Sequence, residues 1–245
     1  LIKIPNPPNR FLADPFIWQK NGIHYCFVED FHYSKNKGCI SVFKITRDNY
    51  EEVEVVLEEN FHLSYPFLFN YKNDLYMCPE THEAEEIRLY KCIEFPNKWE
   101  YLKTIMLNVS AVDTNIFEKN GRWWLITNIC SGDLKDHSSE LHIFSSDNPI
   151  STEWKPNKQN PVIFDPLIGR NGGLIIDNEE VYRVRQKQGF NLYGEALEVA
   201  KIIKLSDEEY KEEKIFKVEP KFFSGINGTH TYNYKNGLLT IDYLK

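Results

Sequence analysis

No run of roughly 20 apolar residues occurs in the 245-residue sequence, so we expect no membrane-spanning helix. No signal peptide is visible either. Basic residues do not predominate, because 29 Lys and Arg stand against 36 Asp and Glu, giving a formal net charge of −7. Nucleic-acid binding requires a basic surface, so this charge argues against a nucleic-acid partner. No glycine-rich loop of the nucleotide-binding type opens a helix.

Cysteine is sparse and is not arranged as a disulfide framework or a zinc motif. The five residues are Cys26, Cys39, Cys78, Cys92 and Cys130. Their number is odd and no pair has CxxC spacing, so we expect buried, reduced thiols, with a zinc site or a catalytic thiol as the alternative. The histidines show no metal-ligand spacing. We therefore expect no metal and no cofactor, and reduced thiols favour a cytoplasmic location.

Aromatic residues, by contrast, are abundant. They make up 14% of the chain, and hydrophobic residues make up 42%, a composition that favours pleated β structure. Residues 13–27, ADPFIWQKNGIHYCF, contain two apolar runs separated by Asn21-Gly22, which is a strong hairpin signal. Asp14 places a carboxylate at the head of the first run, where a core residue would be expected.

This pattern occurs five times, at intervals of 48 to 58 residues. The heads of the repeats are Asp14, Tyr65, Asp113, Asn171 and Thr229. The expected turn pairs are Asn21-Gly22, Asn73-Asp74, Asn120-Gly121, Asn178-Glu179 and Asn236-Gly237. Further strand-like runs lie between the hairpins at 39–45, 87–93, 141–146 and 196–203. The repeats predict one all-β domain over residues 1–245, a five-bladed β-propeller with about four antiparallel strands per blade.

In a propeller, the first strands of the blades line a central channel, so the five heads should meet at one mouth. A second polar column follows 15 residues after the heads, at Glu29, Glu80, Asn128 and Gln186. One polar column is explained by strands leaving the core. Two columns at the same end favour a functional mouth, with Asp14, Asp113, Glu80 and Glu29 as candidate catalytic residues.

Basic residues flank the same positions. Arg170 precedes the fourth head, His230 follows the fifth, and Arg183 and Arg185 lie on the fourth return strand. The candidate substrate-binding residues are therefore Tyr65, Asn128, Arg170, Asn171, Arg183, Gln186 and His230.

Two further patterns predict local structure. Trp123 and Trp124 could stack on a sugar, although tryptophan in such a strand is more typical of a core. Ser206 and Glu209 form a capping-box pattern, which predicts a helix over 205–213.

Six motifs between residues 11 and 233 carry a family resemblance: FLADPF, SYPFLF, VDTNIF…RWWL, GRNGG, YRVRQ…YGEAL and GTHTYN. Together they resemble the five-bladed propellers of the furanosidase type, in glycoside hydrolase families 43, 62, 32, 68 and 117. The chain is more similar still to the N-terminal region of plant glucosamine inositolphosphorylceramide transferases. Similar regions occur in bacterial glycan-assembly proteins.

The resemblance to family 43 implies roles for two residues. There, a first-blade Asp activates water, a third-blade Asp orients, and a fourth-blade Glu protonates the leaving group; Asp14 and Asp113 match the first two positions. The fourth-blade position holds Asn171 beside Arg170 and has no Glu, whereas glycoside hydrolysis normally needs a protonated acid. Arg170 points instead to an anionic group in the ligand, because its planar fork pairs with phosphate or carboxylate.

Three interpretations follow. The first is a carbohydrate-active domain of glycan biosynthesis that binds or processes a sugar, a sugar phosphate or a glycolipid, and meets a membrane only through the glycolipid. The second is a glycoside hydrolase with Asp14 as base and Glu80 or Glu29 as acid. The third is a non-catalytic scaffold, which would not require clustered carboxylates. Because the chain begins at Leu1, we also expect additional catalytic domains in the same polypeptide.

Overall fold

Five β-hairpins organise the chain, as the repeats predict. The computed structural model describes residues 2–132, 136–189 and 192–245. Both turn residues of each hairpin have positive φ, the type I′ geometry that matches the twist of the flanking strands. The turn pairs are Asn21-Gly22, Lys72-Asn73, Asn120-Gly121, Asn178-Glu179 and Asn236-Gly237. The second turn therefore lies one residue earlier than predicted.

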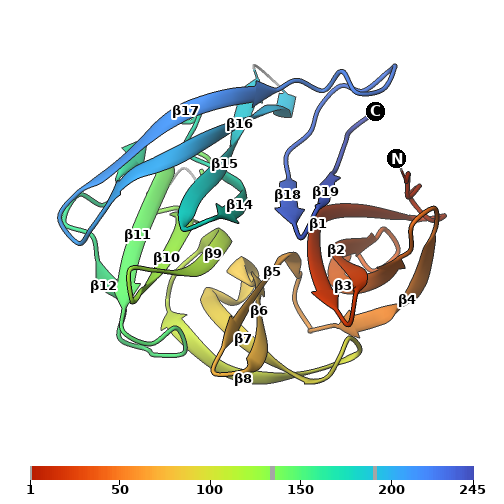
Figure 1. The fold of residues 1–245 in the computed structure, drawn as a ribbon, viewed down its shortest axis with the longest axis horizontal. Coiled ribbons are helices and arrows are strands. Elements are labelled where there is room, and N and C mark those ends of the chain that lie inside the picture. The colour runs from red at the N-terminus through yellow and green to blue at the C-terminus, as the bar shows by residue number, and fades with distance from the viewer. Residues whose placement is uncertain (1, 133–135, 190–191) are drawn as a thin grey trace.

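Four of the hairpins are extended into antiparallel blades (Figure 1). The first blade contains β1 (Arg10–Lys20), β2 (Ile23–His32), β3 (Lys37–Ile45) and β4 (Tyr50–Leu57). The second contains β5 (Ser64–Tyr71), β6 (Asp74–Glu80), β7 (Glu86–Glu94) and β8 (Lys98–Leu107), with the short 3₁₀ helix η1 (His82–Ala84) between β6 and β7. The third contains β9 (Ala111–Lys119), β10 (Arg122–Ile129), β11 (Glu140–Ser146), β12 (Lys155–Pro156) and β13 (Ile163–Phe164). The fourth contains β14 (Asn171–Asp177), β15 (Glu180–Gly189), β16 (Leu192–Leu205) and β17 (Tyr210–Val218).

The prediction of five blades is wrong: the propeller has four blades and a separate two-stranded sheet. This closing hairpin consists of β18 (Tyr232–Lys235) and β19 (Leu238–Ile241) and lies between β14 and β1 (Figure 1). The repeat that begins at Thr229 provides residues for a hairpin only, and none of the other described strands pairs with β18 or β19.

The helix predicted over 205–213 is also wrong. β16 ends at Leu205 and β17 begins at Tyr210, so a tight turn joins two strands there. The Ser206 Oγ accepts a hydrogen bond from the Glu209 N–H at 3.0 Å, and the Ser206 N–H donates to the Glu209 carbonyl at 3.0 Å. The capping pattern is satisfied locally, but in a β-turn, because long pairing between β16 and β17 decides the secondary structure on both sides.

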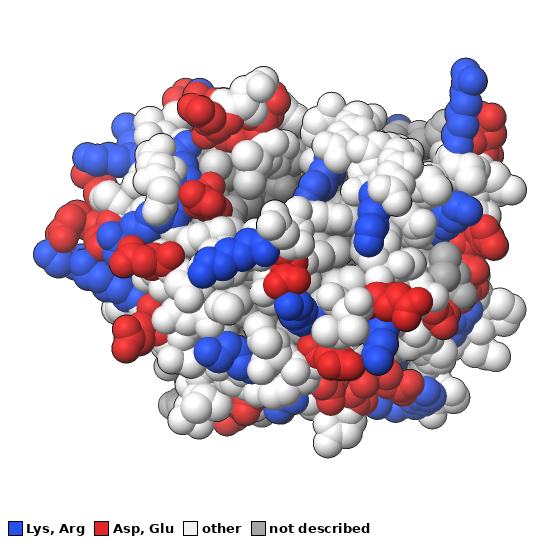
Figure 2. Space-filling model, turned by 60° about the horizontal axis from the view of Figure 1, so that its bottom comes forward, with Lys and Arg blue, Asp and Glu red and all other residues white. Residues whose placement is uncertain are grey.

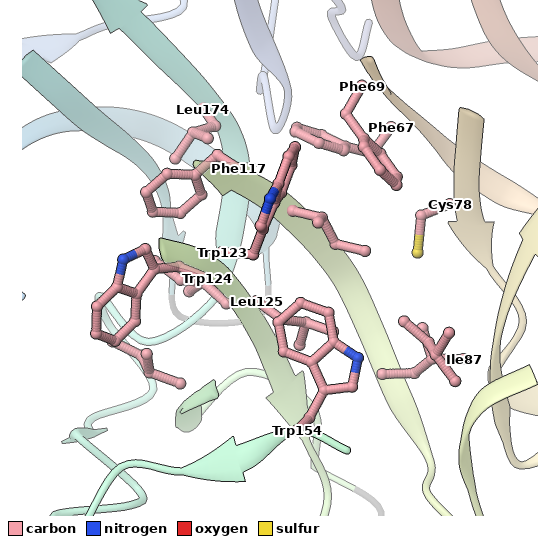
Figure 3. Close-up of a cluster of buried hydrophobic side chains, with 14 of the residues drawn as sticks. Phe67, Phe69, Cys78, Ile87, Phe117, Trp123, Trp124, Leu125, Trp154 and Leu174 are labelled. Atoms are coloured by element: carbon pink, nitrogen blue, oxygen red, sulfur yellow. The ribbon is translucent and has the colours of Figure 1, made fainter. Parts of the chain in front are cut away.

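Large apolar side chains fill the space between blades. Trp123 and Trp124 are buried in a cluster with Phe117, Leu125 and Leu174, which confirms that both tryptophans are core residues (Figure 3). All five cysteines are free thiols; three are buried, and Cys92 and Cys130 are half-buried. The expectation of reduced thiols in strands therefore agrees with the structure.

Two glycines permit the closing hairpin to approach the fourth blade. A Cβ at Gly172 would lie 2.5 Å from the His230 carbonyl oxygen, and one at Gly173 would collide with the Tyr232 carbonyl oxygen. Gly173 also has a φ of 139°, which favours glycine. The GRNGG motif thus has a structural role in bringing β14 against β18.

The outer surface carries charges of both signs. On the face shown in Figure 2, Lys and Arg side chains are interspersed with Asp and Glu side chains. Among the described residues, the structure contains no helix of sufficient length and apolarity to cross a membrane.

Candidate functional site

The heads of the first three blades share an unusual backbone conformation. Asp14, Tyr65 and Asp113 have φ values of 50°, 45° and 52°. In β1, β5 and β9, the pairing with the neighbouring strand shifts register at these residues, which is the signature of a β-bulge. Positive φ is rare for non-glycine residues and is strained for a bulky residue such as tyrosine. The bulges bring the three heads together at one end of the channel, which we call the mouth.

Asp14 is a hub of this mouth. The Tyr65 N–H donates to its Oδ2 at 3.2 Å, and the Thr231 hydroxyl donates to its Oδ1 at 2.5 Å. The His230 Nε2 lies 3.4 Å from the same Oδ1. Asp14 is 6% exposed, and burial, with smaller contributions from Asp242 and Glu80, raises its pKa despite the opposing charge of His230. The first carboxylate thus joins the first blade, the second blade and the closing hairpin.

Sequence reasoning missed Asp242, which holds His230 in place. The His230 Nδ1 lies 2.9 Å from the Asp242 Oδ2, and the N–H groups of His230 and Thr231 both donate to the Asp242 Oδ1 at 2.9 Å. Burial opposes the charged imidazole, but Asp242, Asp14 and Asp113 outweigh burial and raise the pKa of His230 to about 10. The ring is therefore positively charged at neutral pH.

Glu29 and Glu80 lie at the same mouth with opposite tendencies. Burial raises the pKa of Glu29 well above its ordinary value, and the charges of Asp14 and Glu80 raise it further. Burial also opposes ionisation of Glu80, but His82, whose Nδ1 lies 2.8 Å from the Glu80 Oε1, together with Arg170 lowers its pKa overall. One carboxyl therefore favours the protonated state and the other the ionised state.

Asp113 forms the third side of the mouth. The Arg170 Nε donates to its Oδ2 at 2.6 Å, and the guanidinium lies 5.1 Å from the centre of the Tyr193 ring. Burial raises the pKa of Asp113 to about 7, although Arg170 acts in the opposite direction. Among the described residues, no hydrogen bond engages the Arg170 Nη1 or Nη2. The two terminal nitrogens of its fork are therefore available to a ligand.

Four predicted binding residues have protein partners instead. The Asn171 amide donates to the Asp113 carbonyl at 2.9 Å, and its Oδ1 accepts a hydrogen bond from Arg183. The Asn128 Oδ1 accepts the Asn171 N–H, and Gln186 donates to the Asn171 carbonyl. Arg183 is fully buried and also binds both carboxylate oxygens of Glu212. These contacts support a positioning role at the junction of blades three and four.

Tyr65 contributes its backbone to the mouth rather than its ring. Its side chain is fully buried, donates a hydrogen bond to Asn115 at 3.1 Å and packs edge-on against Phe16. The predicted catalytic residues Asp14, Glu29, Glu80 and Asp113 do come together, as the mutual effects of their charges on pKa require.

The opposite half of the channel is aromatic. A cavity of about 430 Å³ is lined by Trp18, Phe69, Phe117 and Trp123, among other residues. The Lys235 Nζ lies 3.5 Å from the centre of the Trp18 ring, and burial lowers the pKa of this amine to about 8. The channel is therefore acidic at the mouth and apolar toward the hairpin turns.

One group of potential metal ligands lies at the mouth, formed by Asp14, His230 and Asp242. Both ring nitrogens of His230 already face carboxylate oxygens, at 3.4 Å and 2.9 Å. A charged imidazole cannot also bind a cation, so this group forms an ion-pair network.

Comparison with known proteins identifies relatives over most of the chain. Residues 2–236 match the family described as glucosamine inositolphosphorylceramide transferase 1, N-terminal. Glucosamine inositolphosphorylceramide transferase 1 of Arabidopsis thaliana is 36% identical over 213 residues, which cover 85% of this chain. The protein of the same name from Oryza sativa subsp. japonica is 35% identical over 210 residues, or 84% of this chain. In both comparisons the chain spans only 28% of the relative's length.

Solved structures support the fold alone. A family 117 glycoside hydrolase from Zobellia galactanivorans has a TM-score of 0.63 at 11% identity, covering 87% of this chain and 71% of that one. The catalytic domain of a GH62 α-L-arabinofuranosidase from Coprinopsis cinerea has a TM-score of 0.65 at 10% identity, with coverages of 94% and 78%. The GH32 β-fructofuranosidase of Bombyx mori has a TM-score of 0.64 at 12% identity, with coverages of 96% and 55%.

Proposed function

Because the chain belongs to the family of N-terminal domains of glucosamine inositolphosphorylceramide transferase 1, we propose that it is a carbohydrate-active domain of glycan biosynthesis. Its ligand is a sugar, a sugar phosphate or the headgroup of a glycolipid, bound at the mouth. The names of the relatives mention glucosamine and inositolphosphorylceramide, which agree with such a ligand. A reaction of the complete protein would also involve the part of the relatives that this chain does not span.

The observation that carries this proposal is the convergence of four largely buried carboxyl groups on one mouth. Asp14, Glu29, Glu80 and Asp113 are 6%, 7%, 7% and 3% exposed. Burying several carboxyls costs free energy, which a scaffold would have no reason to incur. Carboxylates accept hydrogen bonds from the hydroxyl groups of a sugar, so the cluster fits a polyhydroxylated ligand.

Arg170 supports an anionic group on that ligand. Its Nε is held by Asp113 at 2.6 Å and its guanidinium faces Tyr193, so the orientation of the fork is fixed. A phosphate could then accept hydrogen bonds from Nη1 and Nη2 together, which is the geometry that arginine provides and lysine does not.

A catalytic role has a specific observation in its favour, namely the different protonation of neighbouring carboxyls. Glu29 favours the protonated state and can act as a general acid, whereas Glu80 favours the ionised state. Paired groups with separated pKa values are typical of acid–base sites. If the domain cleaves or transfers a glycosyl group with Asp14 as base, Glu29 is therefore a better acid than Glu80.

The test is calorimetric titration of the full chain with glucosamine and with inositol monophosphate. We expect Asp14→Asn to weaken binding of either ligand by about 1.5–3 kcal/mol, the value of a charged hydrogen bond. Arg170→Ala should weaken binding of inositol monophosphate much more than binding of glucosamine. If turnover of any glycan is found, Glu29→Gln should lower it by roughly 10²- to 10⁴-fold with little effect on binding.

Asp74→Asn and Arg122→Ala are the matched controls, because Asp74 and Arg122 form surface ion pairs at the hairpin-turn ends of β6 and β10. Neither control should change binding. Equal affinities for the mouth variants and the controls would exclude the mouth as the binding site. Binding without turnover in all assays would leave a binding domain and remove the hydrolase alternative.

A further inference from the structure

A second cluster of chemically reactive side chains lies in the first blade, away from the carboxyls of the mouth. Asp30 and His32 are two residues apart on β2, so their side chains point to the same face of the sheet. Cys39 on β3 pairs directly with Asp30. Glu29 belongs to the opposite face, because side chains alternate along a strand. The ligand atoms of Asp30, His32 and Cys39 all lie within 4.8 Å of one another.

The two carboxylate oxygens of Asp30 are used very differently. Its Oδ2 accepts hydrogen bonds from the Arg10 Nη1 at 2.7 Å and from the Ser41 hydroxyl at 2.7 Å. Its Oδ1 is buried and has no hydrogen-bond partner among the described residues. The His32 Nε2, also buried and without a partner in the described part of the chain, lies 3.6 Å from this oxygen. Leaving two such atoms unsatisfied costs about 1–3 kcal/mol each.

We propose that Asp30, His32 and Cys39 form a binding site for a divalent transition-metal ion of the zinc type. One ion between the three side chains would satisfy both unpartnered atoms at once. Bonds of roughly 2.0–2.3 Å to nitrogen, oxygen and sulfur place tetrahedral ligand atoms about 3.3–3.8 Å apart. The separation of 3.6 Å between Asp30 and His32 already has this value.

The donor set selects the kind of metal. Imidazole nitrogen and thiolate sulfur suit zinc and related transition metals, whereas magnesium and calcium prefer oxygen ligands alone. Three protein ligands leave a fourth position for water or a small ligand, as in zinc sites that are not closed by a fourth side chain.

The surroundings complete the site. Arg10 and Ser41 fix the orientation of the Asp30 carboxylate through the oxygen that faces away from His32, which is the usual function of groups behind a metal ligand. The positive charge of Arg10 would repel a cation, but Glu52 lies 3.1 Å from the Arg10 Nη2 and compensates it. With the Cys39 thiolate and the Asp30 carboxylate, the charges around a divalent ion are then balanced.

The sequence motif is Asp-x-His followed by Cys seven residues later, across the β2–β3 turn. It has no CxxC or HxxxH spacing, because the pairing of two antiparallel strands brings the third ligand to the first two. An ion at this position would tie the ends of β2 and β3 together directly behind Glu29, which is held by β2.

The test is titration of the metal-free full chain with Co²⁺, followed by absorption spectroscopy. We expect an intense thiolate-to-cobalt charge-transfer band that one equivalent of Zn²⁺ removes. Zn²⁺ at a concentration a hundredfold above its dissociation constant should raise Tm by roughly 5–10 °C. Cys39→Ser should abolish the band, and His32→Gln should weaken metal binding roughly tenfold or more.

Two neighbouring residues of the same strand provide matched controls. Cys26→Ser removes another buried thiol of β2, and His24→Gln removes another histidine of β2; neither should change the band or the metal affinity. His32→Gln changes a half-buried residue, so it keeps the test decisive if Cys39→Ser folds poorly. Absence of a charge-transfer band, or a band and Tm rise that survive His32→Gln, would overturn the proposal.

Discussion

At the scale of single residues, the mouth consists of side chains whose backbone or protonation state is unfavourable in isolation. Tyr65 has a positive φ although tyrosine is bulky, and Asp113 has a pKa raised to about 7. Positive φ costs an L-residue about 1–2 kcal/mol. Such costs persist where the surrounding structure enforces them, and they are concentrated at functional sites. Here the bulges enforce them, and their common consequence is to bring Asp14, Tyr65 and Asp113 together.

His230 gives a prediction for the pH dependence of stability. The pKa of His230 is raised to about 10 in the folded protein, above the value of 6.5 for an unperturbed ring. The folded state therefore binds the proton more tightly, and this stabilisation is complete below pH 6.5 and is lost as the pH rises toward 10. Over this range the free energy of unfolding of the wild type should fall relative to His230→Gln, by on the order of 1 kcal/mol per pH unit.

Urea unfolding at pH 7, 8 and 9 measures this difference. Other titrating groups are present in both proteins, so they cancel in the comparison. His24→Gln, at an exposed position near Asn236, should keep the wild-type slope. Parallel slopes for the wild type and His230→Gln would mean that the ion pairs with Asp14 and Asp242 do not hold the proton.

At the scale of elements, the turns could be predicted from the sequence and the bulges could not. Asn-Gly at 21–22, 120–121 and 236–237 directly encodes two residues of positive φ. Lys72-Asn73 lacks glycine, so the pair was assigned one residue too late. A bulge depends on which residues pair across the strands, and nothing in the letters around Asp14 distinguishes it. Asp242 was missed for the same reason: it lies 13 rather than 15 residues after its head, because the closing hairpin has no register shift.

The fourth turn gives a prediction at this scale. Glu179 has a φ of 70° in the position that type I′ turns reserve for glycine. Glu179→Gly should relieve the strain of about 1–2 kcal/mol and lose roughly 0.5–1 kcal/mol through the greater freedom of the unfolded chain. We therefore expect a net stabilisation of about 0.5–1 kcal/mol, measured as the free energy of unfolding in urea.

The control for this substitution is Glu213→Gly, in the exposed middle of β17. Glycine in a strand interior should destabilise the protein by roughly 0.5–1 kcal/mol. A loss of stability in both variants would show that the fourth turn does not require glycine-like conformation in solution.

At the scale of the whole molecule, the repeats predicted the architecture but not its closure. Heads spaced by about 50 residues indicate a propeller because each blade buries its faces against its neighbours. The last repeat has the same head and turn as the others, and the sequence pattern therefore counted it as a blade. In the structure it supplies only the closing hairpin, whose contacts with Asp14 and with the Pro15 carbonyl, through Asn233 and Thr240, join the last repeat to the first.

The closure gives the last prediction. Gly173 lies against the Tyr232 carbonyl and has a φ of 139°, so alanine there must push the closing hairpin away from the fourth blade. We expect Gly173→Ala to lower the free energy of unfolding by about 2 kcal/mol or more and to increase hydrogen exchange of the β18 and β19 amides. Gly132→Ala is the control, because its Cβ would meet open space. Because the closing hairpin holds His230 and Asp242 against Asp14, ligand binding at the mouth should weaken with the same substitution. If Gly173→Ala exchanges and unfolds like Gly132→Ala, the hairpin does not depend on this approach, and the ring must be closed through its contacts with β1 alone.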